Sequence, residues 1–194
     1  MIEIRFDEHK LRQVEQQLAA IPKALPRVMS RGLNRTATEA RTLTSRRLSQ
    51  STGLRVKDVR DRIAIERASY TNWRSAIRFR AGGLPIVRFS HEQTGEGITW
   101  RPSRGKTRTI PHAFIARMPA SGHTGVFLRA RYAKGRYIAM KGRKKEAIYE
   151  QKVRLQDVFA ESQAEMDQIY AESMQRLQKN IHDQVQLILR QRVA

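Results

Sequence analysis

Thirteen arginine and lysine side chains lie between Gly97 and Lys145, and no aspartate or glutamate interrupts them. Guanidinium and ammonium groups bind phosphate and carboxylate oxygens, and a guanidinium does so bidentately without losing its proton. The chain has a formal net charge of +20, of which this segment contributes +13. Because such one-sided charge repels itself, the segment predicts a polyanion or an acidic protein surface as its neighbour.

The residues predicted to contact such a partner share a cationic side chain and a place in the basic segment. They are Arg101, Arg104, Lys106, Arg108, Arg129, Arg131, Lys134, Arg136, Lys141, Arg143, Lys144 and Lys145. Nucleic acid would meet them through its phosphates, with an affinity that falls steeply as salt rises. Aromatic residues between them, such as Trp100 and Phe127, are more typical of a core than of base stacking. An acidic protein partner and a solvated basic face remain alternatives.

Residues that could perform catalysis are few and scattered. The five histidines lack the spacing of metal ligands, and the absence of cysteine excludes disulfides and thiolate metal sites. Asp58 and Asp61 lie among basic neighbours, which is more typical of a solvated helix face than of a catalytic carboxylate pair. Gly82-Gly83 lacks the lysine and hydroxyl residue of a phosphate-binding loop. The sequence therefore predicts no enzymatic activity, no metal and no cofactor.

The elements that position these residues predict an α+β fold. Ile2, Ile4 and Phe6 alternate with polar residues as in a short strand, after which Asp7 caps a helix that ends at Pro22. A second helix is expected from about Ala24 to a stop at Gly53, followed by a short helix over 57–63. The chain is expected to form one domain, with helices over 7–63, a basic β-rich middle over 64–150 and a long helix over 155–190.

The second predicted helix has an apolar face and a basic remainder. Its apolar residues are Leu25, Val28, Met29, Leu33, Ala37, Ala40, Leu43 and Leu48. Most of their steps are three to five residues, which keeps them broadly on one side of a helix. The other positions carry Arg27, Arg31, Arg35, Arg41, Arg46 and Arg47.

Short strand-like segments separated by turn signals fill the middle of the chain and predict a small antiparallel sheet. The segments are residues 64–68, 75–79, 84–89, 98–101, 112–118 and 125–130. Thr94-Gly95, Pro102 and Ser121-Gly122 are among the expected turns, and residues 133–145 are expected to form an exposed loop or hairpin tip.

A long helix is expected from about Leu155 to Arg190. One apolar stripe follows it, made of Met166, Tyr170, Met174, Leu177, Ile181, Val185 and Ile188. This stripe predicts packing on the sheet, on the second helix or on a neighbouring subunit. No apolar run in the sequence is long enough to span a membrane.

Five segments resemble the minor tail protein Z family of long-tailed bacteriophages and prophages. They are Met29–Arg47 with Leu33-Asn34-Arg35, Thr52–Lys57, Gly83–Ile86, Ile110–Met118 and Gly122–Arg129. Their order and spacing agree with the family over roughly residues 24–129, whereas residues 95–106 depart from its pattern. A strand–turn–strand scaffold, rather than a reactive site, is expected from Pro111, Ala113, Phe114, Ile115, Gly122, His123, Gly125 and Phe127.

The resemblance implies a structural virion protein that is made in the host cytoplasm and completes the tail at its head-proximal end. Such proteins act beside the tail terminator and the neck or connector proteins, and help the tail to join a head and pass DNA. The resemblance further implies a ring of copies, most simply six-fold, around the DNA channel. A soluble, non-specific nucleic-acid-binding protein is the alternative. An enzyme acting on nucleic acid through Asp58, Asp61 or Glu66 is a more distant one.

Overall fold

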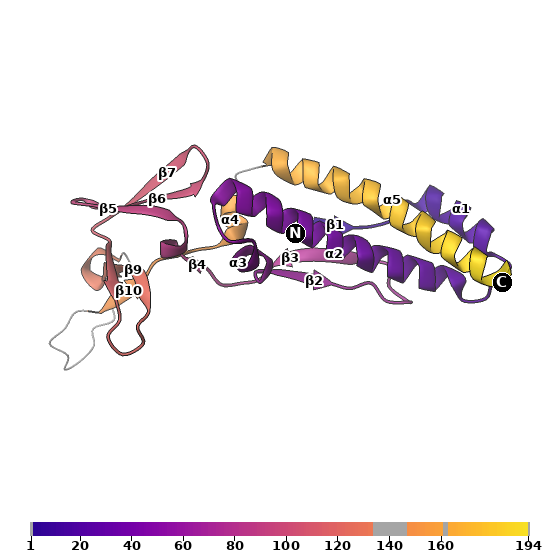
Figure 1. The fold of residues 1–194 in the computed structure, drawn as a ribbon, viewed down its shortest axis with the longest axis horizontal. Coiled ribbons are helices and arrows are strands. Elements are labelled where there is room, and N and C mark those ends of the chain that lie inside the picture. The colour runs from indigo at the N-terminus through magenta and orange to yellow at the C-terminus, as the bar shows by residue number, and fades with distance from the viewer. Residues whose placement is uncertain (1, 134–146, 161–162, 194) are drawn as a thin grey trace. The chain divides into compact units, whose positions relative to one another are not determined.

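The computed structural model describes residues 2–133, 147–160 and 163–193 (Figure 1). Six of the predicted basic residues lie outside these ranges, namely Lys134, Arg136, Lys141, Arg143, Lys144 and Lys145. The chain divides into two compact units: unit 1 takes residues 1–47, 56–80 and 162–194, and unit 2 takes residues 48–55 and 81–161. The single domain expected from the sequence stays a prediction.

Unit 1 combines helices with a three-stranded antiparallel sheet, in agreement with the predicted α+β class. Its elements are β1 (Ile2–Ile4), α1 (Glu8–Leu18), α2 (Ala24–Thr52), α3 (Val56–Arg60), β2 (Ile63–Glu66), β3 (Ser75–Phe79) and α5 (Gln163–Val193). Residues 48–52 of α2 belong to unit 2. β3 is the central strand, and its Ile77 pairs with Ile2 on one side and with Ile65 on the other.

The helix ends of this part of the chain follow local signals that the sequence predicts. The carboxylate of Asp7 accepts a hydrogen bond from the Lys10 N–H at 3.0 Å, so Asp7 is the N-cap of α1. α2 ends at Thr52, and Gly53 adopts the left-handed conformation with φ of 74°. α3 is shorter than predicted, because Ile63 already begins β2.

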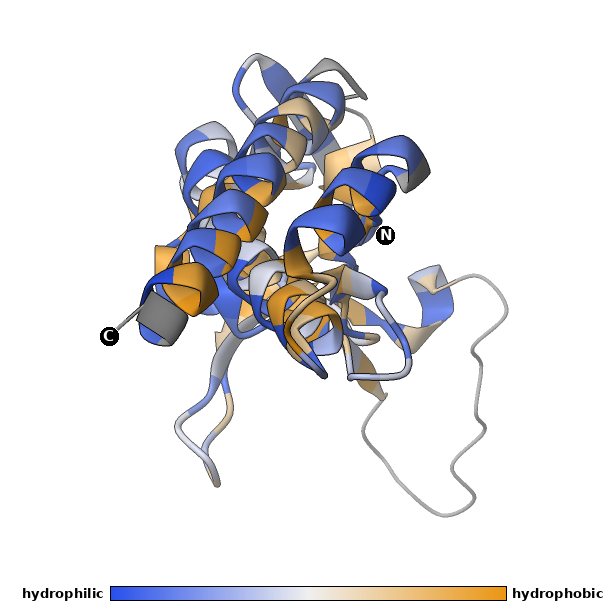
Figure 2. Cartoon of the chain, turned by 90° about the vertical axis from the view of Figure 1, so that its right-hand side faces the viewer, coloured by the Kyte–Doolittle hydropathy of each residue, from blue (hydrophilic) through white to orange (hydrophobic). Residues whose placement is uncertain are grey.

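α5 packs antiparallel along α2 within unit 1. The Arg47 guanidinium donates to Gln168 near the start of α5, whereas Thr36 accepts a hydrogen bond from Asn180 farther along it. Figure 2 shows the helices with hydrophobic residues on one side and hydrophilic residues on the other. Small polar residues of both helices are buried as well, namely Ser30, Thr36, Thr44, Ser45 and Ser173. The apolar pattern of the sequence could not identify them.

The predicted stripe of α5 is correct from Leu177 onward and wrong at Tyr170, while Met166 and Met174 are half-buried. The stripe residues Leu177, Ile181, Val185 and Ile188 are buried, but Tyr170 is 48% exposed. The buried positions at this end are Ile169 and Ser173, whose hydroxyl donates to the Ile169 carbonyl at 2.7 Å. The pattern selected Tyr170 and Met174, whereas the buried positions are the residues just before them, Ile169 and a serine whose polar group is satisfied by its own helix.

The described residues of unit 2 form three small antiparallel sheets. Its elements are β4 (Leu84–Pro85), a 3-10 helix (Ile86–Arg88), β5 (Ser90–Thr94), β6 (Gly97–Ser103), β7 (Lys106–Pro111), β8 (Phe114–Arg117), β9 (Thr124–Arg129), a second 3-10 helix (Ala130–Tyr132), β10 (Ile148–Glu150), β11 (Lys152–Val153) and α4 (Leu155–Ala160). The strand orders are β5-β6-β7, β10-β9-β8 and β11-β4. The sequence predicted one helix from Leu155, whereas α4 and α5 are separate helices in the described residues.

Several predicted strands of unit 2 need correction. Only Leu84–Pro85 of the segment 84–89 is a strand, because a 3-10 helix follows it. Pro102 is not a turn residue; it is buried inside β6, where the pairing with β7 is irregular. β5 and β7 went unpredicted because their side chains are mostly polar and exposed, so no apolar alternation marks them.

Candidate polyanion-binding surface

Four of the predicted basic residues project from the β5-β6-β7 sheet of unit 2. Arg101 lies on β6, Arg104 lies in the following turn, and Lys106 and Arg108 lie on β7. All four side chains are exposed. The N–H of Arg104 donates to the Ser51 carbonyl at 2.9 Å, which anchors this turn to the rest of the unit. The β6–β7 hairpin is therefore a fixed support for a dense group of cations.

These cations do not share one face of the sheet. Arg108 lies opposite Trp100 in the register, so both side chains point to the same face. Arg101 follows Trp100 directly and points to the other face, where it lies opposite Ser90. A partner that lies against one face of the sheet would therefore contact only some of these cations. A partner with a groove that encloses the hairpin would contact the cations of both faces.

β7 is an edge strand with exposed side chains on both of its faces. Every residue from Lys106 to Thr109 is exposed. Lysine and arginine side chains on an edge strand make it unfavourable for the edge of another sheet to pair there. We interpret the hairpin as a surface that presents side chains, rather than backbone groups, to a partner.

Arg129 and Arg131 are held by aromatic rings at the end of the second sheet. The guanidinium of Arg129 lies 5.5 Å from the ring centre of Phe114, and that of Arg131 lies 5.8 Å from the ring centre of Tyr132. Tyr132 in turn stacks on His112 with 4.1 Å between ring centres. Stacking on an aromatic ring orients a guanidinium plane, so both cations leave the sheet in defined directions.

The family-like segments 110–118 and 122–129 form the β8–β9 hairpin and the end of β7. Phe114 lies opposite Phe127 in the register, and Ala113 and Phe127 are buried. Pro111 ends β7, and Ile115 lies on β8 with its N–H bonded to the Gln93 side chain at 3.1 Å. The scaffold role of these residues stays a prediction.

The turn of this hairpin contains a glycine in the left-handed region. Gly122 has a φ of 66°, and its N–H donates to the Met118 carbonyl at 2.8 Å. The Met118 N–H donates in turn to the His123 carbonyl at 2.7 Å, which closes the loop between the strands. These two hydrogen bonds fix where the His123 side chain leaves the turn.

His123, Glu150 and Lys152 form the clearest charged cluster of unit 2. Glu150 Oε1 lies 2.6 Å from His123 Nε2, and Glu150 Oε2 lies 2.8 Å from Lys152 Nζ. Burial raises the pKa of Glu150, but the hydrogen bonds from Lys152 and His123 outweigh it and lower the pKa below its ordinary value. An ionised carboxylate held between two donors is a structural cross-link between the β8–β9 turn and the strands β10 and β11.

Sequence reasoning missed this cluster because its members are far apart in the chain. His123 and Glu150 are separated by 27 residues, and only the pairing of β10 with β9 brings them together.

Asn34 of the family-like segment 29–47 was noticed in the sequence, but the residue that it contacts was not predicted. Its side-chain amide makes hydrogen bonds to both backbone groups of Ala68, at 2.9 and 3.0 Å, and so ties the end of β2 to α2.

The carboxylates considered for catalysis do not assemble into a site in the described residues. Glu66 is ion-paired with Arg78 at 2.7 Å, and Asp58 and Asp61 belong to α3 and the turn after it. No cluster of three or more histidine, aspartate and glutamate side chains suited to a metal occurs among the residues that the structure describes. Among the same residues, no helix is both long and apolar enough to cross a membrane.

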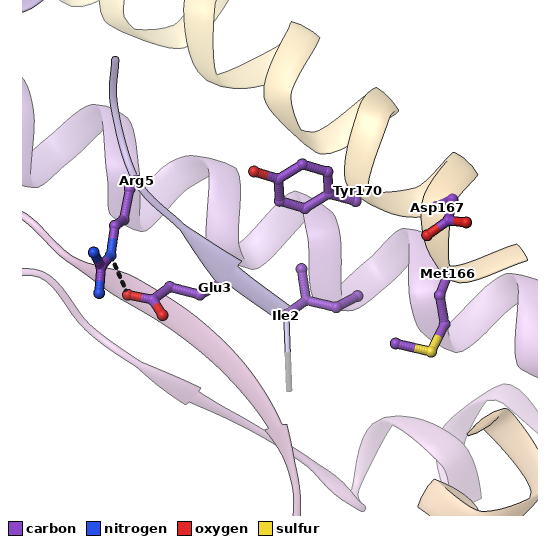
Figure 3. Close-up of a pocket in the computed structure, with 6 residues that line it drawn as sticks. All are labelled: Ile2, Glu3, Arg5, Met166, Asp167 and Tyr170. Atoms are coloured by element: carbon purple, nitrogen blue, oxygen red, sulfur yellow. Dashed lines mark hydrogen bonds and ion pairs between the residues drawn. The ribbon is translucent and has the colours of Figure 1, made fainter. Parts of the chain in front are cut away.

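A pocket of about 360 Å³ in unit 1 lies between β1 and the start of α5 (Figure 3). It is lined by Ile2, Glu3, Arg5, Met166, Asp167 and Tyr170. The hydrogen bond from Arg5, with further help from Arg74, lowers the pKa of Glu3. Because Glu3 is already paired with arginine, this pocket resembles an ordinary surface hollow rather than a reactive site.

The comparison with known protein families decides the identity of the chain. Residues 10–194 match the family described as prophage minor tail protein Z (GPZ). The chain belongs to the prophage minor tail protein Z family. Searches of curated proteins and of solved structures found no match. The minor tail protein Z family is one of phage tail structural proteins rather than of enzymes, so tail proteins of the virion are the expected partners of the protein.

Proposed function

We propose that this minor tail protein Z family member completes the phage tail at its head-proximal end, as a ring of copies that joins the tail to the head and lets DNA pass. Family membership supports the assignment to the tail. The observation that supports the more specific role, at the head-proximal end of the tail, is the acid-free segment from Gly97 to Lys145. A ring multiplies a net charge of +20 and therefore needs DNA or acidic neighbouring proteins close to it.

The partners in this proposal are the tail terminator and the neck or connector proteins, with a six-fold ring as the simplest arrangement. The exposed β6–β7 hairpin supports it, because Arg101 and Arg108 point to opposite faces and can serve two neighbours at once. One neighbour would be the DNA in the channel, and the other would be an adjoining ring.

Cryo-electron microscopy of particles from the producing strain tests the proposal. The expected result is density for this chain, arranged as a ring at the junction of head and tail. A chain that is absent from intact particles, or located elsewhere along the tail, would contradict the proposed position. The same map would show whether the β6–β7 hairpin faces DNA or protein.

Charge reversal of the hairpin tests the role of its cations separately. The variant Arg101→Glu, Arg104→Glu, Arg108→Glu should leave free heads and free tails in the lysate, which negative-stain microscopy can count. The matched control Lys10→Glu, Arg12→Glu, Lys57→Glu changes the net charge equally at exposed residues of unit 1. Equal numbers of joined particles from both variants would show that the hairpin has no special part in joining.

A soluble nucleic-acid-binding protein is the second candidate function, and the same acid-free segment favours it. Sedimentation of a lysate separates the two. A tail-completion protein sediments with tails after nuclease treatment, whereas a free nucleic-acid binder sediments with DNA and is released by nuclease or by salt.

A further inference from the structure

A second basic surface lies on α2 of unit 1, outside the segment from Gly97 to Lys145. The exposed residues of α2 within this unit are Arg27, Arg31, Arg35, Thr38, Thr42 and Arg46. Successive members are three or four residues apart, so the six neighbours form one continuous ridge that winds gradually along the exposed side of the helix. We call this set the α2 ridge. Every other position of α2 in unit 1 is buried or half-buried.

The arginines of α2 divide into two groups by their contacts. Arg47 is ion-paired with Glu172, Arg41 donates to the Arg60 carbonyl at 3.2 Å, and Arg35 pairs with Glu39 at 3.3 Å. Arg27, Arg31 and Arg46 have no ion pair within the part of the chain that the structure describes. Three ridge cations are therefore available to a partner, whereas Arg35, Arg41 and Arg47 are engaged within the unit.

A cation from α5 adds to the ridge. Arg46 and Arg176 line the same small groove between α2 and α5, together with the short side chains of Thr38 and Thr42. Arg176 is exposed and likewise has no ion pair among the described residues. Glu39, the acid of this groove, is occupied by Arg35 and by the Asn180 amide. Two like charges that meet at one groove repel each other unless an anion lies between them.

We propose that the α2 ridge, with Arg176 beside it, binds the phosphate backbone of duplex DNA without sequence preference. Arg27 and Arg46 are about 28 Å apart along the helix axis, at 1.5 Å for each residue. That length is slightly below one turn of duplex DNA, which presents phosphates of both strands over about 34 Å.

The residue types of the ridge favour DNA over an acidic protein. Protein interfaces have an apolar or aromatic centre surrounded by polar residues. The ridge exposes only arginine and threonine, both of which contact phosphates in protein–DNA complexes. It exposes no asparagine or glutamine, which read adenine edges, and most protein–DNA hydrogen bonds go to phosphate and sugar, so contact with the backbone is the expected mode.

Fluorescence anisotropy of the full-length chain with a labelled duplex of random sequence tests the proposal, measured over a range of salt concentrations. The ridge variant is Arg27→Gln, Arg31→Gln, Arg46→Gln, which leaves the paired Arg35 intact. Because each lost phosphate contact lowers the salt slope by about 1, the slope of log affinity against log salt should fall by about 2 to 3. The basic residues of unit 2 are unchanged, so residual binding is expected.

Two further variants make the result specific. The control Lys10→Gln, Arg12→Gln, Lys57→Gln removes the same charge from exposed residues on α1 and α3 and should leave the slope nearly unchanged. The variant Arg27→Lys, Arg31→Lys, Arg46→Lys keeps the charge and should keep most of the slope. Equal losses in the ridge variant and the control would overturn the proposal, because they would show an effect of net charge alone.

Binding to polyglutamate distinguishes the other class of partner. If the ridge variant lost affinity for polyglutamate but not for duplex DNA, the surface would belong to an acidic protein and the proposal would be wrong. The inference concerns DNA binding by the isolated chain and does not rest on its position in the tail. A failure of the binding test and a failure to find the protein at the head–tail junction are therefore separate results.

Discussion

At the scale of single residues, Gly32 of α2 is in close packing contact with Ile181 of α5. A Cβ atom added at Gly32 would lie 2.3 Å from Ile181 Cδ1 and 3.1 Å from its Cγ1. Both residues are buried, so the isoleucine has little room to move. Glycine at this position therefore allows the two helices to approach, although it lowers helix propensity by about 1 kcal/mol relative to alanine.

We predict that Gly32→Ala destabilises the protein by about 1 to 3 kcal/mol, as other overpacked cores do. Urea unfolding followed by circular dichroism measures the change. Ile181→Val removes the clashing methyl group at a cost of about 1 kcal/mol by itself. The double variant Gly32→Ala, Ile181→Val should lose less stability than the sum of the losses measured for the two single variants. A more stable Gly32→Ala variant would contradict the close approach of the helices.

Glu150 leads to a prediction about pH. Its pKa is lowered in the folded state, so its contribution to stability is complete above the ordinary carboxyl pKa of 4.5 and is lost as the pH falls through the lowered value. Glu150→Gln should therefore be less stable than the wild type at pH 7 and similar to it in strong acid. Urea unfolding at both pH values measures this difference. A difference of the same size at both would exclude the carboxylate as its source.

At the scale of elements, the end of α2 depends on the left-handed backbone of Gly53. A Cβ at Gly53 would meet no atom within 4 Å, so a substitution there tests the backbone conformation alone. We predict that Gly53→Ala costs about 1 to 2 kcal/mol, the strain of a left-handed non-glycine residue. Gly95→Ala is the matched control, because Gly95 has the same open surroundings without a left-handed φ, and it should change stability little. Equal unfolding midpoints for the two variants would contradict this role.

The bounds of α1 and α2 could be predicted closely from the sequence, but the C-terminal helices and the strands only in part. Asp7, Ala24 and Gly53 are local signals that act within a few residues, and each marks the boundary that the structure shows. β5 and β7 have polar, exposed side chains and exist because β6 pairs with them. Such strands are set by tertiary pairing, which residue patterns do not contain.

The charge of the candidate surfaces could be predicted from the sequence, but the arrangement of their side chains could not. The acid-free segment is visible in the sequence, but the opposite directions of Arg101 and Arg108 follow from the register of β6 with its neighbours. The α2 arginines are also visible, yet the sequence does not show that Arg47 is paired with Glu172 while Arg46 has no ion pair in the described structure. Contacts between distant segments therefore decide which cations remain for a partner.

At the scale of the whole molecule, the net charge of +20 acts against compactness. Salt screens this repulsion over about 10 Å at 0.1 M. A bound polyanion reduces this repulsion more than salt does, because it places negative charge directly against the cations. It also stabilises the folded state by mass action. The charge is thus suited to a protein that reaches full stability only beside a partner.

We predict that inorganic polyphosphate raises the thermal unfolding temperature more than sodium chloride at equal ionic strength. Screening alone would make the two salts equivalent, whereas phosphate groups in contact with ridge and hairpin arginines add binding energy to the folded state. Scanning calorimetry with each salt measures the difference. Because Arg27→Gln, Arg31→Gln, Arg46→Gln leaves the hairpin cations in place, this variant should lose only part of the polyphosphate effect. Identical shifts with both salts would mean that the charge is only screened, and that neither surface binds a polyanion in the isolated chain.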